Sequence, residues 1–173
     1  AYHSWDDFED ADRNTNAPNI IMTGSLDGNV SAIKVSPFTT DSSTIFVGTE
    51  SGSVFKVTNA DTADANDNST ANWSNITGSQ FLGSVSDIEF GKDENHIFVT
   101  FHNYGVENIF YSEDGGQSWT EKEGNLPDIP VRCILQNPLS LNEVIIGTEL
   151  GVWYTKNFES DNPDWSRANS GMS

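Results

Sequence analysis

The sequence predicts an all-β fold made of repeated four-stranded antiparallel units, and three observations carry this prediction. Runs of β-branched and aromatic residues recur in the same order along the chain, and short glycine-containing turns join them in pairs. Trp73, Trp119 and Trp165 close successive units and lie 46 residues apart in both intervals. A period of about 40–50 residues with four short strands is that of a β-propeller blade. We therefore predict about three consecutive blades of a larger β-propeller.

Each predicted blade begins with one strand and continues with a hairpin. The first strands are residues 30–35, 85–90 and 131–135, and the hairpins are residues 45–57, 97–111 and 144–154. The resulting division is 1–24 as the end of a preceding blade or a linker, 25–78 as blade one, 79–124 as blade two and 125–173 as blade three. Since a propeller ring needs about four to eight blades, we expect the remaining blades of the same propeller as partners.

The connection to the fourth strand differs among the blades. In blade two it matches the pattern Ser-x-Asp-x-Gly-x-x-Trp at Ser112, Asp114, Gly116 and Trp119. Asp114 is expected to accept hydrogen bonds from nearby backbone N–H groups, and Trp119 to pack between neighbouring sheets. Blade one has residues 59–72 at this place and blade three has residues 157–164, and neither keeps the Ser-x-Asp-x-Gly core. We expect those two turns to be held in another way.

The 112–119 pattern resembles the Asp-box (BNR-like) motif, which recurs in β-propellers of sialidases, sortilin-like receptors and several glycosidase families. Residues 82–90, 99–106 and 143–153 are similar to Asp-box propellers of large secreted Bacteroidetes proteins that commonly end in a type IX secretion sorting domain. The resemblance covers about residues 18–173. It implies the propeller fold and an extracellular bacterial location, but as a fold-level resemblance it implies no particular activity. The four motif residues are accordingly expected to be structural.

Composition excludes several classes of partner. The chain has 26 acidic and 8 basic residues and a formal net charge of −18, which argues against nucleic acid or an anionic membrane surface. No run of about 20 apolar residues is present, so we expect no membrane insertion. Cys133 is the only cysteine, which excludes an intrachain disulfide, and its place within a strand predicts a buried side chain.

The acidic and basic residues predict no catalytic site. Of the three arginines that a sialidase would need, Arg132 lies on a first strand and Arg167 on a last strand, so they are not expected to converge with Arg13. Asp87 and Glu89 share one face of a first strand, where they could line the axial channel, contact a ligand, or serve as a glycosidase carboxylate pair. Two further carboxylates, Glu50 and Glu149, occupy equivalent hairpin turns, which favours a repeated structural role.

Three aromatic residues are candidate contacts for a sugar or another ligand: Tyr104 in a turn, and Trp153 and Tyr154 beside the turn at Gly151. For Trp153 the preferred alternative is packing between blades. No cofactor is predicted. Calcium is a weaker hypothesis, for which Asp61, Asp64 and Asp67 offer oxygen ligands in one loop. The three histidines have no metal-ligand spacing, and His96 is expected to be exposed.

The sequence leaves three functions open. The first is a non-catalytic part of a secreted propeller that acts as a rigid binding or display scaffold for polysaccharide or protein. The second is part of an Asp-box glycoside hydrolase, sialidase-like or glucanase-like, whose catalytic residues lie partly in other blades. The third is a sortilin-like propeller that binds a peptide as an added strand at a blade edge.

Overall fold

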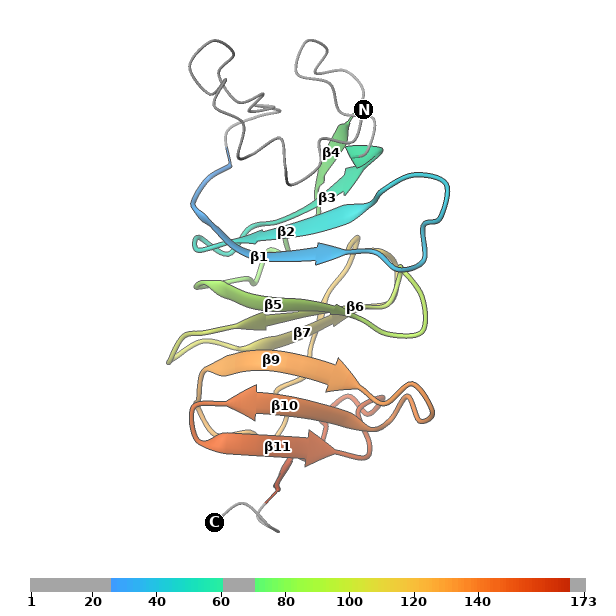
Figure 1. Ribbon diagram of the computed structural model, residues 1–173. Coiled ribbons are helices and arrows are strands. Elements are labelled where there is room, and N and C mark those ends of the chain that lie inside the picture. The colour runs from blue at the N-terminus through green and yellow to red at the C-terminus, as the bar shows by residue number, and fades with distance from the viewer. Residues whose placement is uncertain (1–25, 61–70, 169–173) are drawn as a thin grey trace, which may run out of the picture.

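The structure, a computed structural model, describes residues 26–60 and 71–168, and these form three four-stranded antiparallel sheets stacked face to face (Figure 1). Blade one contains β1 (Val30–Val35), β2 (Ile45–Thr49), β3 (Val54–Thr58) and β4 (Asn72–Asn75). Blade two contains β5 (Val85–Phe90), β6 (Ile97–Phe101), β7 (Ile109–Ser112) and β8 (Thr120–Glu121). Blade three contains β9 (Val131–Gln136), β10 (Val144–Thr148), β11 (Gly151–Thr155) and β12 (Ser166–Arg167). The predicted all-β fold of four-stranded blades is confirmed. The segment 1–24 lies outside the described residues.

All three blades have the same strand order and the same irregularity. Strands follow one another across each sheet in sequence order. Near the start of β1, β5 and β9 the pairing with the second strand shifts by one residue. A bulge of this kind re-aims the side chains that follow it. As a result Ile33, Ile88 and Ile134 occupy one register position, opposite Val47, Val99 and Ile146 respectively.

The blades are joined through their first strands. β5 lies against β1 and β2 of blade one, and β9 lies against β5 and β6 of blade two. Between blades one and two the ring of Phe90 from β5 packs on Phe46 from β2, with ring centroids 5.1 Å apart. Between blades two and three Phe98 packs on Phe158 at 5.2 Å. Because all four side chains are at most 8% exposed and each buried side chain of this size contributes about 1.5–3 kcal/mol, these contacts are a main source of stability.

Tryptophan indoles also connect each blade to the one before it. Trp119 Nε1 donates to the carbonyl of Ile76 at 2.8 Å, and Trp165 Nε1 donates to the carbonyl of Lys122 at 3.0 Å. Donor and acceptor are 43 residues apart in both pairs, so the bond repeats with the blade. Trp73 has the equivalent place in blade one, and its buried Nε1 has no acceptor among the residues that the structure describes.

The 112–119 turn of blade two is closed by its own serine and aspartate side chains. Ser112 Oγ donates to Asp114 Oδ1 at 2.8 Å and accepts from Gly116 N at 2.8 Å. Asp114 also accepts from the backbone N–H and the hydroxyl of Ser118, at 2.9 and 2.6 Å. These hydrogen bonds, with that of the Ser118 hydroxyl the largest cause, lower the pKa of Asp114 to about 2. Gly116 has φ 91°, and a Cβ there would lie 2.9 Å from the side chain of Ile76 in blade one.

Blade three forms a related turn from different residues. Thr155 Oγ1 donates to Asn157 Oδ1 at 2.7 Å and accepts from Asn157 N at 3.3 Å. Asn157 Oδ1 then accepts from Asp164 N at 2.9 Å. Thr155-x-Asn157 thus makes the same kinds of bond as Ser112-x-Asp114, across a longer loop. The motif pattern did not predict this equivalence, because threonine and asparagine replace the two defining residues.

Two expectations about burial were wrong. Cys133 is exposed, because it alternates with Ile134 and shares with Leu135 the face of blade three that no described residue covers. His96 is only 12% exposed, since its ring lies 6.1 Å from that of Tyr111 and its Nδ1 is 2.6 Å from Asp93 Oδ1.

Asp114→Ala is expected to lower the free energy of unfolding by about 1–2 kcal/mol, because the turn loses its acceptor for Ser112 and Ser118. The midpoint of thermal unfolding, followed by circular dichroism, should fall by roughly 2–6 °C. Since the folded-state pKa lies below the ordinary value of 3.8, the contribution of Asp114 is fully present above that pH and is lost as the pH falls towards 2. Glu113→Ala, at the exposed neighbouring position, is the matched control, and equal midpoints for the two variants would contradict a structural role for Asp114.

Candidate binding site

The connections β6–β7 and β10–β11 lie on one side of the blade stack, at the left-hand ends of the strands in Figure 1. They comprise residues 102–108 and residues 149–150, which we call the turn end of blades two and three. The 112–119 turn follows the other end of β7, so it lies away from the turn end. Short polar loops at the end of a rigid β scaffold are where binding residues are usually found.

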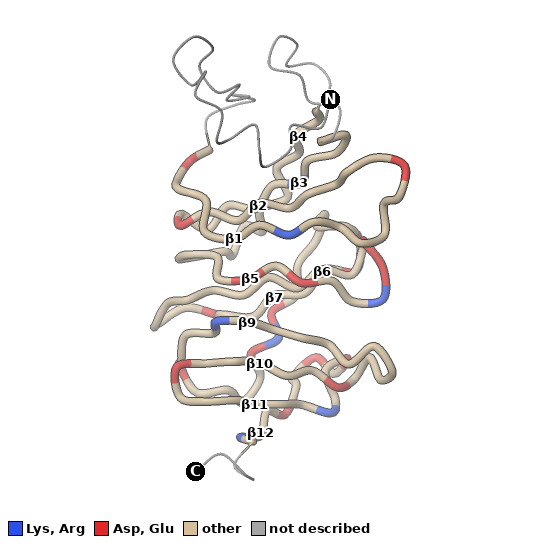
Figure 2. The backbone as a smooth tube through the Cα atoms, viewed as in Figure 1, with Lys and Arg blue, Asp and Glu red and all other residues tan. Residues whose placement is uncertain are grey.

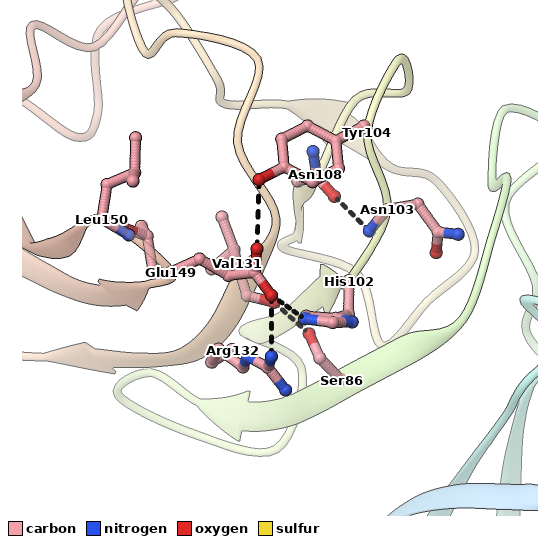
Figure 3. A network of polar contacts seen from close by, with 10 residues as sticks. Ser86, His102, Asn103, Tyr104, Asn108, Val131, Arg132, Glu149 and Leu150 are labelled. Carbon is pink, nitrogen blue, oxygen red and sulfur yellow. Dashed lines mark hydrogen bonds and ion pairs between the residues drawn. The ribbon is translucent and has the colours of Figure 1, made fainter.

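Glu149 is the centre of a polar cluster at the turn end (Figure 3). Its Oε2 accepts from the hydroxyl of Tyr104 at 3.0 Å, and its Oε1 accepts from Arg132 Nη2 at 2.8 Å. His102 Nε2 lies 3.2 Å from the same Oε1. Two side chains from blade two and one from the start of β9 therefore converge on a carboxylate of blade three.

The cluster holds Glu149 in its ionised form. The hydrogen bond from Tyr104, followed by that from Arg132, lowers the pKa of Glu149 below its usual range. The same hydrogen bond raises the pKa of Tyr104, because the phenol donates its proton to Glu149 in this bond. An ionised carboxylate can only accept, so the Nε2–H of His102 is the donor in this contact. All three partners then act as donors to one anion, which fixes their positions.

Tyr104 is presented to solvent by a pre-organised loop. Its side chain is 60% exposed, although its hydroxyl is bonded to Glu149. The next residue, Gly105, has φ 72° and donates its N–H to Asp128 Oδ1 at 2.7 Å. On the other side, Asn103 Oδ1 accepts from Ser84 N at 2.6 Å. A ring held in this way offers a flat apolar surface at little cost in conformational entropy.

A second group of acidic residues joins the β6–β7 connection to the end of β8. Carboxylate oxygens of Glu107, Glu121 and Glu123 lie within 4.8 Å of one another, which is close enough to share a cation. Glu123 is 6% exposed and accepts from Asn108 N at 2.8 Å. Burial, and next the hydrogen bond with Glu107, raise the pKa of Glu123 to about 8. At neutral pH the Glu123 carboxyl group is therefore protonated.

Asp87 and Glu89 do not form a pair, although they lie on one strand. Asp87 Oδ2 accepts from Ile134 N of blade three at 3.1 Å, while Glu89 Oε2 pairs with Lys34 Nζ of blade one at 2.7 Å. Burial, the largest cause, raises the pKa of Asp87. Together with Ser86, whose hydroxyl donates to the carbonyl of Val131 at 2.7 Å, Asp87 covers backbone groups along β9. Both carboxylates are thus engaged in contacts between blades.

The other predicted contact residues have different surroundings. Trp153 is partly buried against the apolar cluster between blades two and three. This agrees with the preferred expectation that it packs between blades, and it means that Trp153 does not offer a ring at the turn end. Tyr154 is 36% exposed but faces the outer side of blade three together with Ile145. The three calcium candidates Asp61, Asp64 and Asp67 lie outside the described residues.

Arg132 and Arg167 bond to the same turn of blade three, although their strands were expected to keep them apart. Their strands lie on opposite edges of the sheet, as predicted. However, Arg132 donates to Glu149 and Arg167 Nη2 donates to the carbonyl of Leu150 at 2.7 Å, so both long side chains reach the same turn. The third arginine, Arg13, lies outside the described residues.

Glu50, the equivalent of Glu149 in blade one, accepts from Asn29 Nδ2 at 2.9 Å. Glu50 and Glu149 thus each bond to a residue near the start of their own blade.

The sequence did contain a signal for the cluster around Glu149. His102 and Tyr104 precede Glu149 by 47 and 45 residues, close to the blade period of 46 residues. In stacked repeats, residues one period apart lie side by side on neighbouring units. Polar residues at this separation in two turns are therefore candidates for contact, a relation that the pattern within a single strand does not reveal.

Comparison with known proteins supports the fold. No protein-family model and no curated protein matches the sequence. Among solved structures, the chain is similar to the crystal structure of an ancestral GH74 enzyme, with a TM-score of 0.59 and 24% identity over 86% of this chain and 20% of that one. It is also similar to YCF48 from Cyanidioschyzon merolae, with a TM-score of 0.57 and 16% identity over 79% of this chain and 40% of that one. Both neighbours are β-propellers.

The comparisons establish the fold, which is that of partial propeller blades. At this identity the likeness concerns the fold, and the chain spans about one fifth and two fifths of the two structures it matches. In the described part of the chain, no helix is long and apolar enough to cross a membrane.

Glu123→Gln is expected to change how stability depends on pH. The folded-state pKa of about 8 lies above the ordinary 4.5, so the folded protein binds this proton more tightly than the unfolded chain. The contribution is therefore fully present below pH 4.5 and is lost as the pH rises through 8. Urea denaturation at pH 9 should show the Gln variant to be more stable than the parent, on the order of 2 kcal/mol. Glu113→Gln is the control, and parallel stability–pH curves for parent and Glu123→Gln would refute the assignment.

Proposed function

We propose that this chain is a non-catalytic part of a secreted β-propeller that binds an extracellular polysaccharide or protein at the turn end of blades two and three. Tyr104 provides the main contact surface, and Arg132 and Leu150 flank it. The blades serve as a rigid scaffold, and further blades of the same propeller are its structural partners. An extracellular location agrees with the acidic composition, 26 acidic against 8 basic residues, and with the fold of the GH74 neighbour.

The observation that carries this proposal is the exposed ring of Tyr104 held in place through its hydroxyl. Aromatic rings with one apolar face and one anchored polar end are common at binding surfaces. Leu150, on the β10–β11 turn, is 52% exposed, and the Arg132 side chain is 57% exposed. A ligand with apolar faces and polar groups, such as a pyranose ring or a peptide, matches this mixture. Lys and Arg positions are scattered along the described backbone (Figure 2), which favours an uncharged ligand over a polyanion.

A glycoside hydrolase is the second candidate, and one observation favours it. Glu107 and Glu123 lie close together, and the raised pKa of Glu123 is a property that the acid of a glycoside hydrolase needs. However, Glu123 is only 6% exposed and follows β8, at the opposite side of the sheet from the first strand β5. The scaffold is therefore preferred, with hydrolysis tested directly.

The sortilin-like alternative receives less support. Peptide addition to a sheet requires free N–H and C=O groups along an edge strand. Along β9, Asp87 already accepts from Ile134 N and Ser86 already donates to Val131 O. A peptide strand on this edge would have to displace both side chains.

Glycan and peptide arrays probed with the 173-residue chain test the proposal. Binding to one class of glycan or protein is expected, and Tyr104→Ala should weaken it at least about tenfold, since a large exposed contact is lost. Tyr104→Phe, which keeps the ring, should weaken it less. Tyr154→Ala is the control, because Tyr154 lies away from the turn end. Unchanged affinity in Tyr104→Ala would contradict the site, and release of reducing sugar from any polysaccharide would identify a hydrolase instead.

A further inference from the structure

Negative charge predominates around the exposed ring of Tyr104. The Tyr104 hydroxyl bonds to the carboxylate of Glu149, and Glu107 is an exposed residue of the same connection. Asp128, at the start of blade three, accepts from the N–H of Gly105 at 2.7 Å. After the hydrogen bond to Glu149, which is the largest cause, the charge of Asp128 also raises the pKa of Tyr104. Carboxylates from two blades therefore surround one aromatic ring.

Most of this charge is not compensated within the described chain. Glu149 pairs with Arg132 at 2.8 Å. Glu107 and Asp128 are both exposed, and neither makes an ion pair with any basic side chain of residues 26–60 and 71–168. Uncompensated charges of one sign attract groups of the opposite sign. The surroundings of Tyr104 are thus suited to a ligand that carries positive charge.

The same character continues into blade one. A Cβ on Gly52, in the β2–β3 turn, would lie 2.8 Å from the carbonyl oxygen of Gly83, and Gly83 lies against the side chain of Asn103 in the β6–β7 connection. These three segments are therefore side by side. They add the exposed carboxylate of Glu50, which makes no ion pair within the described ranges, and the side chain of Leu82, which is 63% exposed.

Exposed apolar side chains are interspersed with these carboxylates. Leu82, Tyr104 and Leu150 are each more than half exposed and belong to adjoining connections. Large apolar side chains gathered on one surface mark a contact site. A neutral ligand would cover this surface and leave its charges uncompensated, whereas a ligand with both apolar and cationic groups would satisfy both kinds of side chain.

We propose that the turn end binds an extended segment of a partner protein in which Lys or Arg residues alternate with apolar residues. This inference rests on the proposed function and selects protein as the ligand. A guanidinium group of the segment lies over the ring of Tyr104 as a cation–π contact and pairs with Asp128. Its apolar side chains contact Leu82 and Leu150. Because an extended chain advances about 3.3 Å per residue, about three residues span the roughly 10 Å between neighbouring sheets.

Two matched synthetic peptides and the 173-residue chain test the proposal. Arg alternates with Leu in one peptide, and Gln replaces every Arg in the other. At about 0.15 M salt the Arg peptide should bind at least about tenfold more tightly, as measured by fluorescence anisotropy. Its affinity should fall at least about tenfold in about 1 M salt, because the Debye length shortens from about 8 to about 3 Å.

Substitutions locate the contact. Tyr104→Ala and Asp128→Asn should each weaken binding of the Arg peptide at least about fivefold. Asp128→Asn removes the charge but keeps the side-chain oxygen that accepts from Gly105 N. Glu113→Gln removes a charge from the 112–119 turn, on the other side of the stack, and should leave the affinity unchanged. Circular dichroism spectra and unfolding midpoints that match the parent's verify that the variants are folded.

The outcomes separate this inference from the proposed function. A neutral glycan whose binding is lost in Tyr104→Ala, with no binding of the Arg peptide, would overturn the cationic ligand and retain the turn end as the binding site. Equal weakening by Glu113→Gln and Asp128→Asn would also overturn it, since attraction would then come from the overall charge of −18. If no glycan or peptide loses affinity in Tyr104→Ala, the proposed function fails as well.

Discussion

The first strand of each blade packs on the first two strands of the blade before it, and the rest of the described structure depends on this contact. β5 on β1 and β2, and β9 on β5 and β6, bury the aromatic side chains Phe46, Phe90 and Phe98. Both faces of a blade are apolar, so a single blade cannot bury its own core and is stable only between neighbours. The indole bonds of Trp119 and Trp165 add a hydrogen bond at the outer side of the same interfaces.

Because the sheets are fixed by this packing, the connections on the two sides of the blade stack have different roles. At one end, the 112–119 turn and its counterpart at 155–164 use side-chain hydrogen bonds to close long connections, and Gly116 approaches Ile76 of the preceding blade. Their role is structural. At the turn end, the connections are bonded to one another across blades through Glu149, and they leave Tyr104 exposed. A binding surface there can vary in sequence without disturbing the packing of the sheets.

The candidate site could be predicted only in part. The position of Tyr104 in a turn indicated exposure, and the structure agrees. Asp87 and Glu89 share a face because they alternate along one strand, which made them candidates for lining the channel, contacting a ligand or forming a carboxylate pair. In the structure they bond to different neighbouring blades. Asp87 accepts from the backbone N–H of Ile134 in blade three, and Glu89 pairs with the ammonium group of Lys34 in blade one. These partners lie 47 and 55 positions away in the sequence, a separation that a pattern within one strand does not register.

The sequence by itself determined the architecture, because blade period, strand order and tryptophan spacing are periodic and need only local hydrophobic patterning to be recognised. The tertiary structure alone decided which polar groups meet and which apolar faces stay open. Cys133 and Leu135 are of residue types that are usually buried in strands. They are nevertheless exposed, since burial depends on a neighbouring sheet and not on residue type alone. Likewise, Glu149 becomes the centre of a cluster only when stacking brings His102 and Tyr104 of the previous blade beside it.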